Sequence, residues 1–130
     1  MICHHRKGGF LYMNGSQNIN YKMLPLEDSI SVDKLVTIHY FEFEKDYRFS
    51  GEAHQFWEFL YVDKGEVDIL AGTKGYKLQK GDIVFHPPGE FHSVKANGKT
   101  APNIMVVSFN CSSPSMNYFK SNKIFNLSSY

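Results

Sequence analysis

The feature that most constrains this fold is a succession of short β-type segments, each closed by turn residues. Runs of β-branched and aromatic residues begin near residue 34 and recur to residue 109, with Gly, Asn or Pro between them. Seven or eight short strands joined in this way are typical of a sandwich or a barrel. We expect strands at 34–43, with both faces partly covered, and at 54–62, 66–71, 76–79, 82–86, 91–95 and 104–109.

The size and charge of the chain narrow its class. Its 130 residues fit one domain with its own hydrophobic core. Fourteen Lys and Arg against thirteen Asp and Glu leave a formal charge of +1, which disfavours nucleic-acid binding by this segment alone. No apolar run approaches the roughly 18 residues of a membrane span, and Cys3 and Cys111 belong to no metal-binding motif. We therefore expect a cytoplasmic protein with reduced thiols and no membrane partner.

The composition divides the chain into three regions. Residues 1–20 are polar and rich in Gly, Asn and Ser, which predicts a flexible N-terminal arm. Residues 21–112 hold the strands of the predicted barrel. Residues 113–130 begin with Ser113, which can cap a helix, and Pro114, which suits the first helical position. This last region is expected to start a helical linker or dimerisation segment.

Polar side chains of the ligand type alternate along residues 51–58. If this segment is one regular strand, Glu52, His54 and Glu58 share a face, because alternate residues of a strand point the same way. Phe56 joins them on that face, and Trp57 points to the opposite one. Three polar groups among apolar neighbours are typical of the wall of a partly closed cavity.

A second segment, residues 81–92, ends at another histidine. Gly81 permits a turn into a strand, and the sequence 87–89, Pro-Pro-Gly, ends that strand and reverses the chain. His92 then opens the returning strand. If the two strands are neighbours, His92 faces His54 and Glu58 across the barrel.

The two segments resemble the paired motifs of the cupin superfamily, G-x5-H-x-H-x3,4-E-x6-G and G-x5-P-x-G-x2-H-x3-N. The chain departs from them at Glu52, where the first histidine is expected, and at Ala96, where Asn is displaced by one position to Asn97. The resemblance covers about residues 34–110 and implies an all-β cupin double-stranded β-helix, or jelly-roll barrel, with a short C-terminal helix. The positions that match are His54, Glu58 and Gly65, then Gly81, Pro87, Gly89 and His92.

Finer details resemble one branch of that superfamily. Residues 54–67, HQFWEFLYVDKGEV, resemble the pattern H-x-F-W-E-x-x-Y-V-x-x-G of the sensor domains of AraC-type transcription regulators. The resemblance implies a domain that is not an enzyme, that binds a small-molecule effector such as a sugar, and that dimerises. In that family two helix-turn-helix motifs follow and read DNA. They are absent here, so we expect contact with DNA only through a missing C-terminal domain.

Three interpretations of the polar cluster stay open. The first is a site for a polar small molecule, a sugar or related metabolite, bound by Glu52, His54, Phe56, Glu58 and His92. The second is a divalent metal held by Glu52, His54, Glu58 and His92, because imidazole and carboxylate suit zinc, iron, manganese or nickel. It leads to the alternative function, a metal-dependent cupin enzyme (dioxygenase, isomerase or decarboxylase) acting on a small polar substrate. The third is that these groups only satisfy one another inside the barrel.

Other notable side chains favour structural roles. His86 matches no ligand position of the motifs and is expected at the surface or in packing, and His39 is expected in the core. His4 and His5, in the predicted arm, form a chance pair. For Trp57, packing at an interface is favoured over stacking on a sugar ring. An uncovered apolar face and the terminal helix start predict a homodimer.

Overall fold

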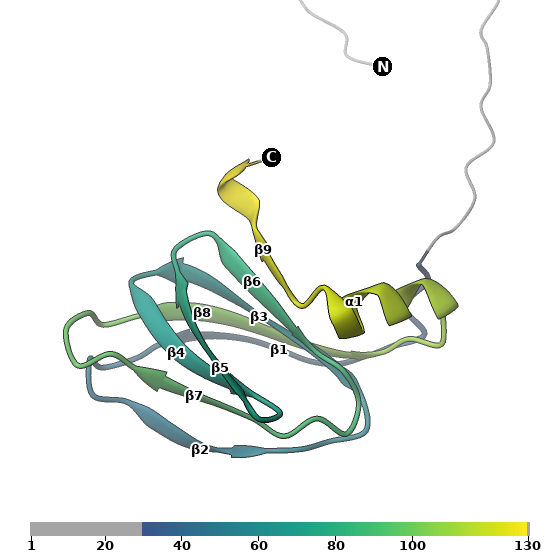
Figure 1. Cartoon of the computed structure of the whole chain (residues 1–130), viewed down its shortest axis with the longest axis horizontal. Helices are drawn as coiled ribbons and strands as arrows, with labels where there is room; N and C mark the ends of the chain where they lie inside the picture. Colours follow the sequence, from purple (N-terminus) through teal and green to yellow (C-terminus); the bar gives the residue numbers. More distant parts are fainter. Residues whose placement is uncertain (1–29, 130) are drawn as a thin grey trace, which may run out of the picture.

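The computed structural model describes residues 30–129, which fold into two antiparallel β-sheets that face each other (Figure 1). The first sheet has the strand order β1-β8-β3-β6-β9, and the second has the order β2-β7-β4-β5. A 3-10 turn (Pro114–Asn117) and the one-turn helix α1 (Tyr118–Ser121) lie between β8 and β9. The strands are β1 (Lys34–Glu42), β2 (Arg48–Glu52), β3 (Trp57–Lys64), β4 (Glu66–Ala71), β5 (Lys74–Gln79), β6 (Asp82–His86), β7 (His92–Ala96), β8 (Asn103–Asn110) and β9 (Ile124–Asn126).

The predicted strands from residue 66 onward are present with boundaries shifted by at most two residues. The predicted arm, residues 1–20, and the predicted start of the barrel at residue 21 lie outside the described residues.

The core lies between the two sheets, where alternate residues of the strands point inward. In β4, Val67, Ile69 and Ala71 are buried, whereas the residues between them are more exposed. Burial of Val67 and of Ile69 contributes about 1.5–3 kcal/mol each, so the core accounts for much of the cohesion between the sheets. Val67 and Ile69 form one hydrophobic cluster with buried residues of β3, β5, β6 and β8, namely Leu60, Val62, Leu78, Val84 and Ile104.

The C-terminal segment covers part of the outer face of the first sheet. Trp57 and Phe109 form a second buried cluster with Met116 of the 3-10 turn, and Phe119 of α1 packs against it. Trp57 is 4% exposed. Its role is therefore packing, as the sequence favours, but the contact lies within the chain and not at an interface between chains.

The C-terminal segment contains a helical turn at the expected place, but without the expected cap, and it continues as a strand. Pro114 occupies the start of the 3-10 turn, but Ser113 makes no side-chain capping bond, because its hydroxyl accepts a hydrogen bond from the N–H of Ser31 (2.8 Å). After α1 the chain forms β9, which pairs antiparallel with β6. The sequence does not predict this edge strand, since three residues are too few to show an alternating pattern.

The strand β1 is more exposed than predicted. It is an edge strand that pairs with β8 alone, and its register shifts between Leu35 and Thr37. Ile38 is 60% exposed. His39, predicted in the core, is also exposed, because no strand within residues 30–129 covers the outer edge of β1.

The predicted strand 54–62 is wrong at its start. The strand β3 begins only at Trp57, and His54 lies in the loop between β2 and β3. The N–H of Gly89 donates to the carbonyl oxygen of His54 (2.7 Å), so the loop is held by the turn before β7. The alternation expected for one continuous strand therefore does not explain why His54 and Glu58 meet.

Gly51 allows β2 to approach β7 closely. Its φ of 114° is a conformation that glycine adopts far more readily than other residues. A Cβ atom on Gly51 would lie 2.8 Å from the carbonyl oxygen of His92, and closer still to the ring of Phe91. Because the two strands approach here, Glu52 lies directly opposite His92 in the register.

We expect Gly51→Ala to lower the free energy of unfolding by more than the about 1–3 kcal/mol of backbone strain alone. Thermal unfolding followed by the fluorescence of Trp57, the single tryptophan, would measure this loss. Gly98→Ala is the matched control, because Gly98 also has a positive φ (79°) but nothing lies within 4 Å of the added Cβ. Equal losses in the two variants would show that close approach at Gly51 is not required.

Candidate functional site

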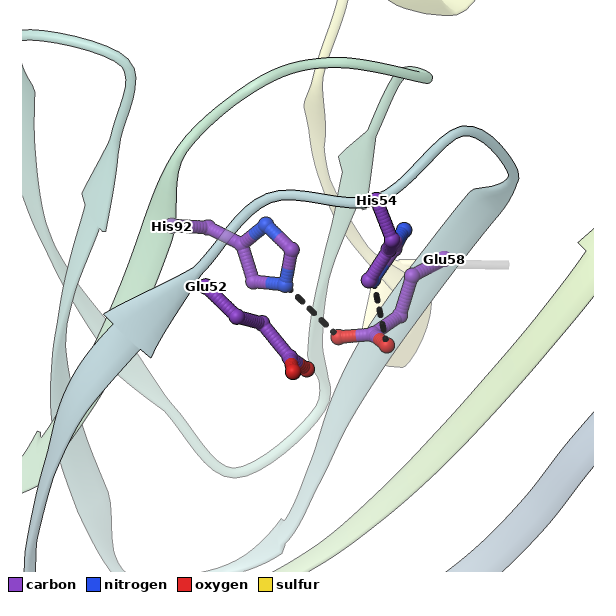
Figure 2. A group of neighbouring side chains, drawn as sticks. All are labelled: Glu52, His54, Glu58 and His92. Carbon is purple, nitrogen blue, oxygen red and sulfur yellow. Dashed lines mark hydrogen bonds and ion pairs between the residues drawn. The ribbon is translucent and has the colours of Figure 1, made fainter.

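Four polar side chains from distant parts of the sequence meet between the sheets (Figure 2). Glu52 comes from β2, Glu58 from β3, His92 from β7, and His54 from the loop before β3. Each offers one nitrogen or oxygen atom, and these atoms all lie within 4.8 Å of one another. The structure therefore brings together the residues that the two sequence segments supply.

The four residues line a cavity of about 420 Å³. This volume lies within the range of about 300–1,000 Å³ typical of small-molecule pockets. Phe56, the fifth predicted site residue, also lines the cavity, and its ring stacks on that of His54 with centroids 3.9 Å apart. The cavity thus combines a polar cluster with a largely apolar wall, which includes Phe41, Phe43, Phe49, Ile69, Val94 and Ile104.

Hydrogen bonds to main-chain carbonyl groups orient both imidazoles. His54 Nδ1 donates to the carbonyl oxygen of Phe56 (3.1 Å), and His92 Nδ1 donates to that of Glu90 (3.0 Å). Since a neutral imidazole carries one proton, each Nε2 is then a lone-pair acceptor. Both Nε2 atoms are directed at the carboxylate of Glu58, each 3.3 Å from one of its oxygens.

Glu58 is a buried carboxylate on which opposing effects act. Burial raises the pKa of Glu58, whereas His92, the hydroxyl of Ser108 and His54 lower it. The net pKa lies below its ordinary value. Ser108 Oγ donates to Glu58 Oε2 at 2.9 Å. Glu58 is therefore ionised at neutral pH and presents two acceptor oxygens to the two ring nitrogens.

This arrangement of acceptors is incomplete. Among the described residues, His92 Nε2 is a buried side-chain atom with no hydrogen-bond partner, although Glu58 lies beside it. A proton, a hydroxyl donor or a metal ion between nitrogen and carboxylate would remove the repulsion.

The donor set fits a divalent metal. Bonds of about 2.0–2.2 Å place neighbouring tetrahedral ligands about 3.3–3.6 Å apart. The distances from Glu58 Oε2 to His54 Nε2 and from Glu58 Oε1 to His92 Nε2, both 3.3 Å, match this spacing. Glu52 is exposed and its carboxylate lies beside the other three groups.

A third histidine lies against the cluster, and the motif spacing does not predict it. His86, at the end of β6, is 1% exposed, and its ring stacks on that of His92 with centroids 4.3 Å apart. It is therefore in packing and not at the surface. Burial, with a smaller contribution from the neighbouring His92, lowers the pKa of His86 to about 3. Strand parity contains the missing signal, because His86 shares the inward face of β6 with Val84.

A larger hollow of about 770 Å³ lies on the outer face of the second sheet. Its wall includes Arg48, Lys77, and the ion pair of Asp68 with Lys95 at 3.9 Å. It is more open than the interior cavity and contains none of the predicted site residues. The interior cavity is therefore the candidate site.

Solved structures define the class of fold. A predicted oxalate decarboxylase from Thermotoga maritima superposes with a TM-score of 0.57 at 22% identity, covering 60% of this chain and 69% of that one. The Cnp3 cupin domain of Schizosaccharomyces pombe gives a TM-score of 0.54 at 13% identity, over 68% and 57% of the two chains. A cupin superfamily protein from Desulfitobacterium hafniense gives 0.53 at 16% identity, over 68% and 84%. The predicted cupin jelly-roll fold is thus confirmed.

The sequence places the chain within that class. A family model for the AraC-like ligand binding domain matches residues 36–113, more than half of the chain. The chain therefore belongs to the family of AraC-like ligand binding domains, as the pattern at residues 54–67 predicts. No curated protein sequence matches it. Within residues 30–129 no helix is long and apolar enough to cross a membrane.

Burial of His86 predicts a fold that loses stability in mild acid. The pKa of His86 is about 3 in the folded protein against an ordinary 6.5. As the pH falls below 6.5, the unfolded chain therefore takes up a proton that the folded chain does not, and the free energy of unfolding falls. Glu58 adds to this loss only as the pH approaches its ordinary pKa of 4.5, because its folded pKa lies below that value.

As the pH falls below 6.5, we expect the free energy of unfolding of the metal-free protein to decrease because of His86. The decrease is at most about 1.4 kcal/mol per pH unit. Urea denaturation at several pH values, followed by Trp57 fluorescence, would measure the slope. His86→Gln should flatten the slope, whereas His39→Gln, at an exposed histidine, should not. An unchanged slope in His86→Gln would contradict the assignment.

Proposed function

We propose that the chain is the effector-sensing domain of an AraC-type transcription regulator, and that the effector is a small polar molecule bound in the interior cavity. The observation that carries this proposal is the buried His92 Nε2, which has no hydrogen-bond partner among the described residues and belongs to a side chain lining a cavity of about 420 Å³. A hydroxyl group of an effector would supply the donor that this atom lacks. The family match supports the sensing role.

The lining favours a neutral ligand rich in hydroxyl groups, such as a sugar. Glu52 and Glu58 are acceptors that repel an anionic ligand in the absence of a metal. The same carboxylates accept hydrogen bonds from hydroxyl groups, as Glu58 does from Ser108. Aromatic rings on the wall, among them Phe41 and Phe56, suit the apolar C–H faces of a sugar ring.

A metal-bound form is the second candidate, and the directions of the two imidazoles favour it. Each Nε2 already points at Glu58 with its proton-bearing Nδ1 held by a main-chain carbonyl group. His54, His92, Glu58 and Glu52 would hold the ion, which would polarise a ligand oxygen and make an anionic ligand acceptable. The cupin enzyme alternative requires this form.

Calorimetry on the metal-free protein separates these forms. We expect at least one neutral monosaccharide to bind. Its uronic or aldonic acid is expected to bind at least about tenfold more weakly, because Glu52 and Glu58 repel the added carboxylate. Glu58→Gln should weaken sugar binding about 10–100-fold, since hydrogen bonds to charged groups contribute about 1.5–3 kcal/mol. Glu44→Gln removes the same charge from an exposed position and is the matched control.

The same titration with Zn²⁺, Mn²⁺ and Ni²⁺ tests the metal-bound form. Stoichiometric binding that is lost in Glu58→Gln, followed by preference for the acids, would favour the metal-bound form over direct sugar binding. Binding of neither the sugars nor the metals would contradict both.

We also propose that the chain forms a homodimer through β1. Ile38 and Tyr40 are exposed on the outer side of this edge strand, whose outer edge is free among the described residues. Lys34 and Glu42 lie at the two ends of the strand, at equal distances in sequence from Ile38. An antiparallel second copy centred on Ile38 would therefore bring Lys34 of each copy near Glu42 of the other.

We expect Ile38→Lys to convert the dimer to a monomer in light scattering, because it would place two like charges at the centre of the paired strands. Lys77→Ile on β5, far from β1 in the sheet order, is the control for a change of surface hydrophobicity. A wild-type monomer at all concentrations, or a dimer that persists in Ile38→Lys, would contradict this interface.

A further inference from the structure

A second cluster of titratable groups, made of His86, Glu90 and Lys123, lies beside the candidate site. His86 Nδ1 donates to Glu90 Oε1 (3.2 Å), and Lys123 Nζ forms a close ion pair with Glu90 Oε2. Glu90 belongs to the turn between β6 and β7, and Lys123 lies between α1 and β9. The motifs that identify the candidate site include none of these three residues.

Glu90 contacts the candidate site through its main chain. Its carbonyl oxygen accepts the Nδ1 proton of His92, while its side chain accepts that of His86, whose ring stacks on His92. One residue thus holds both imidazoles. Because Nδ1 and Nε2 belong to one rigid ring, the position of Glu90 sets the direction of His92 Nε2.

Lys123 supplies the charge that Glu90 needs in this position. The side chains of Lys123 and Glu90 are 19% and 13% exposed, so both are mostly removed from water. His86 offers Glu90 one hydrogen bond from a ring that is 1% exposed, whereas Lys123 brings a cationic ammonium group. Without Lys123 the carboxylate would be left with that single hydrogen bond, which favours movement of Glu90 toward water.

Lys123 is also the residue at which the C-terminal segment begins its main-chain pairing with β6. Its carbonyl oxygen accepts the N–H of Phe85 (2.9 Å), and β9 then forms three residue pairs with β6. The two strands lie side by side in Figure 1. All three residues of β9 are only half-buried, and α1 is a single turn. No residue of 118–127 is fully buried, which is typical of segments that open locally.

We propose that Glu90 is a positioning residue and that its pair with Lys123 couples occupancy of the interior cavity to docking of the C-terminal segment. The proposal rests on the effector-binding function proposed above. A ligand or ion that engages His92 Nε2 favours the ring orientation that Glu90 holds, and so favours Glu90 in the place where it binds Lys123. The segment that leaves the barrel would be firmly docked when the site is filled and looser when it is empty.

Thermodynamic linkage makes the coupling reciprocal. If a bound ligand stabilises docking by a given factor, then loss of docking weakens that ligand by the same factor. Removal of Lys123, which touches neither the ligand nor its cavity, is therefore expected to reduce affinity about five- to tenfold, near the low end of measured couplings. An ion pair with only a structural role would change stability and leave affinity unchanged.

The first experiment measures affinity in the full chain, with Zn²⁺ alone as the probe in calorimetry. We expect Lys123→Gln to weaken Zn²⁺ binding about five- to tenfold and Lys123→Arg to restore it. Lys120→Gln, which removes an exposed charge from α1, should have no effect. Faster hydrogen exchange of residues 118–127 in Lys123→Gln with unchanged affinity would overturn the proposal.

The second experiment needs no ligand and so separates the coupling from the proposed function. Hydrogen exchange of residues 118–127 is compared in metal-free His92→Ala and His54→Ala. His92 is bonded to Glu90, whereas His54 is bonded to Phe56. We expect His92→Ala alone to speed exchange of the segment, by about fivefold, which corresponds to about 1 kcal/mol at 25 °C.

The outcomes are distinct. Failure of wild-type protein to bind Zn²⁺ would count against the metal-bound form of the function, and the exchange comparison would then decide the coupling by itself. Equal exchange in His92→Ala and His54→Ala would overturn the coupling, whether or not Zn²⁺ binds.

Discussion

The structure of the site depends on one buried carboxylate, Glu58, held between two imidazoles. The hydroxyl of Ser108 donates to this carboxylate, and the neighbouring rings stabilise its charge only when they carry a second proton. Each imidazole is turned toward it by a main-chain carbonyl group behind the ring. The protein has thus placed three acceptor groups in contact and left the stabilising donor or cation to come from elsewhere. Such an arrangement is costly unless it is satisfied, which is why the cluster is the candidate site.

The barrel provides the conditions that this cluster needs. The apolar contacts of β4 with β3 and β8 join the two sheets. The chain passes from one sheet to the other between β2 and β3, and between β6 and β7, so residues distant in sequence meet in one cavity. Gly51 and Gly89 act at these two crossings, the first by close approach of strands and the second by its bond to the loop that carries His54.

The sequence predicted what depends on local pattern and failed where long-range contacts decide. Alternation in β4 was sufficient to locate the buried Val67 and Ile69, and motif spacing was sufficient to bring His92 toward Glu58. The loop position of His54 was not predictable, because it depends on a hydrogen bond to Gly89, thirty-five residues away. His39 was misplaced for a similar reason: an apolar strand is expected to be covered, but β1 lies at a sheet edge. His86 was overlooked because its role arises from stacking on His92 and not from motif spacing.

The residue at position 52 carries the strongest chemical consequence of the departure from the cupin motif. With Glu52 in place of a histidine, the cluster contains two carboxylates and two imidazoles, so its formal charge is more negative by one. A more negative, oxygen-richer donor set favours harder cations, and in the absence of a cation it favours neutral hydroxyl donors over anions. The same substitution that weakens the likeness to metal-binding cupins therefore suits a sensor of uncharged polar molecules. Glu52 is also the exposed member of the cluster, so it is the group that an entering ligand would meet first.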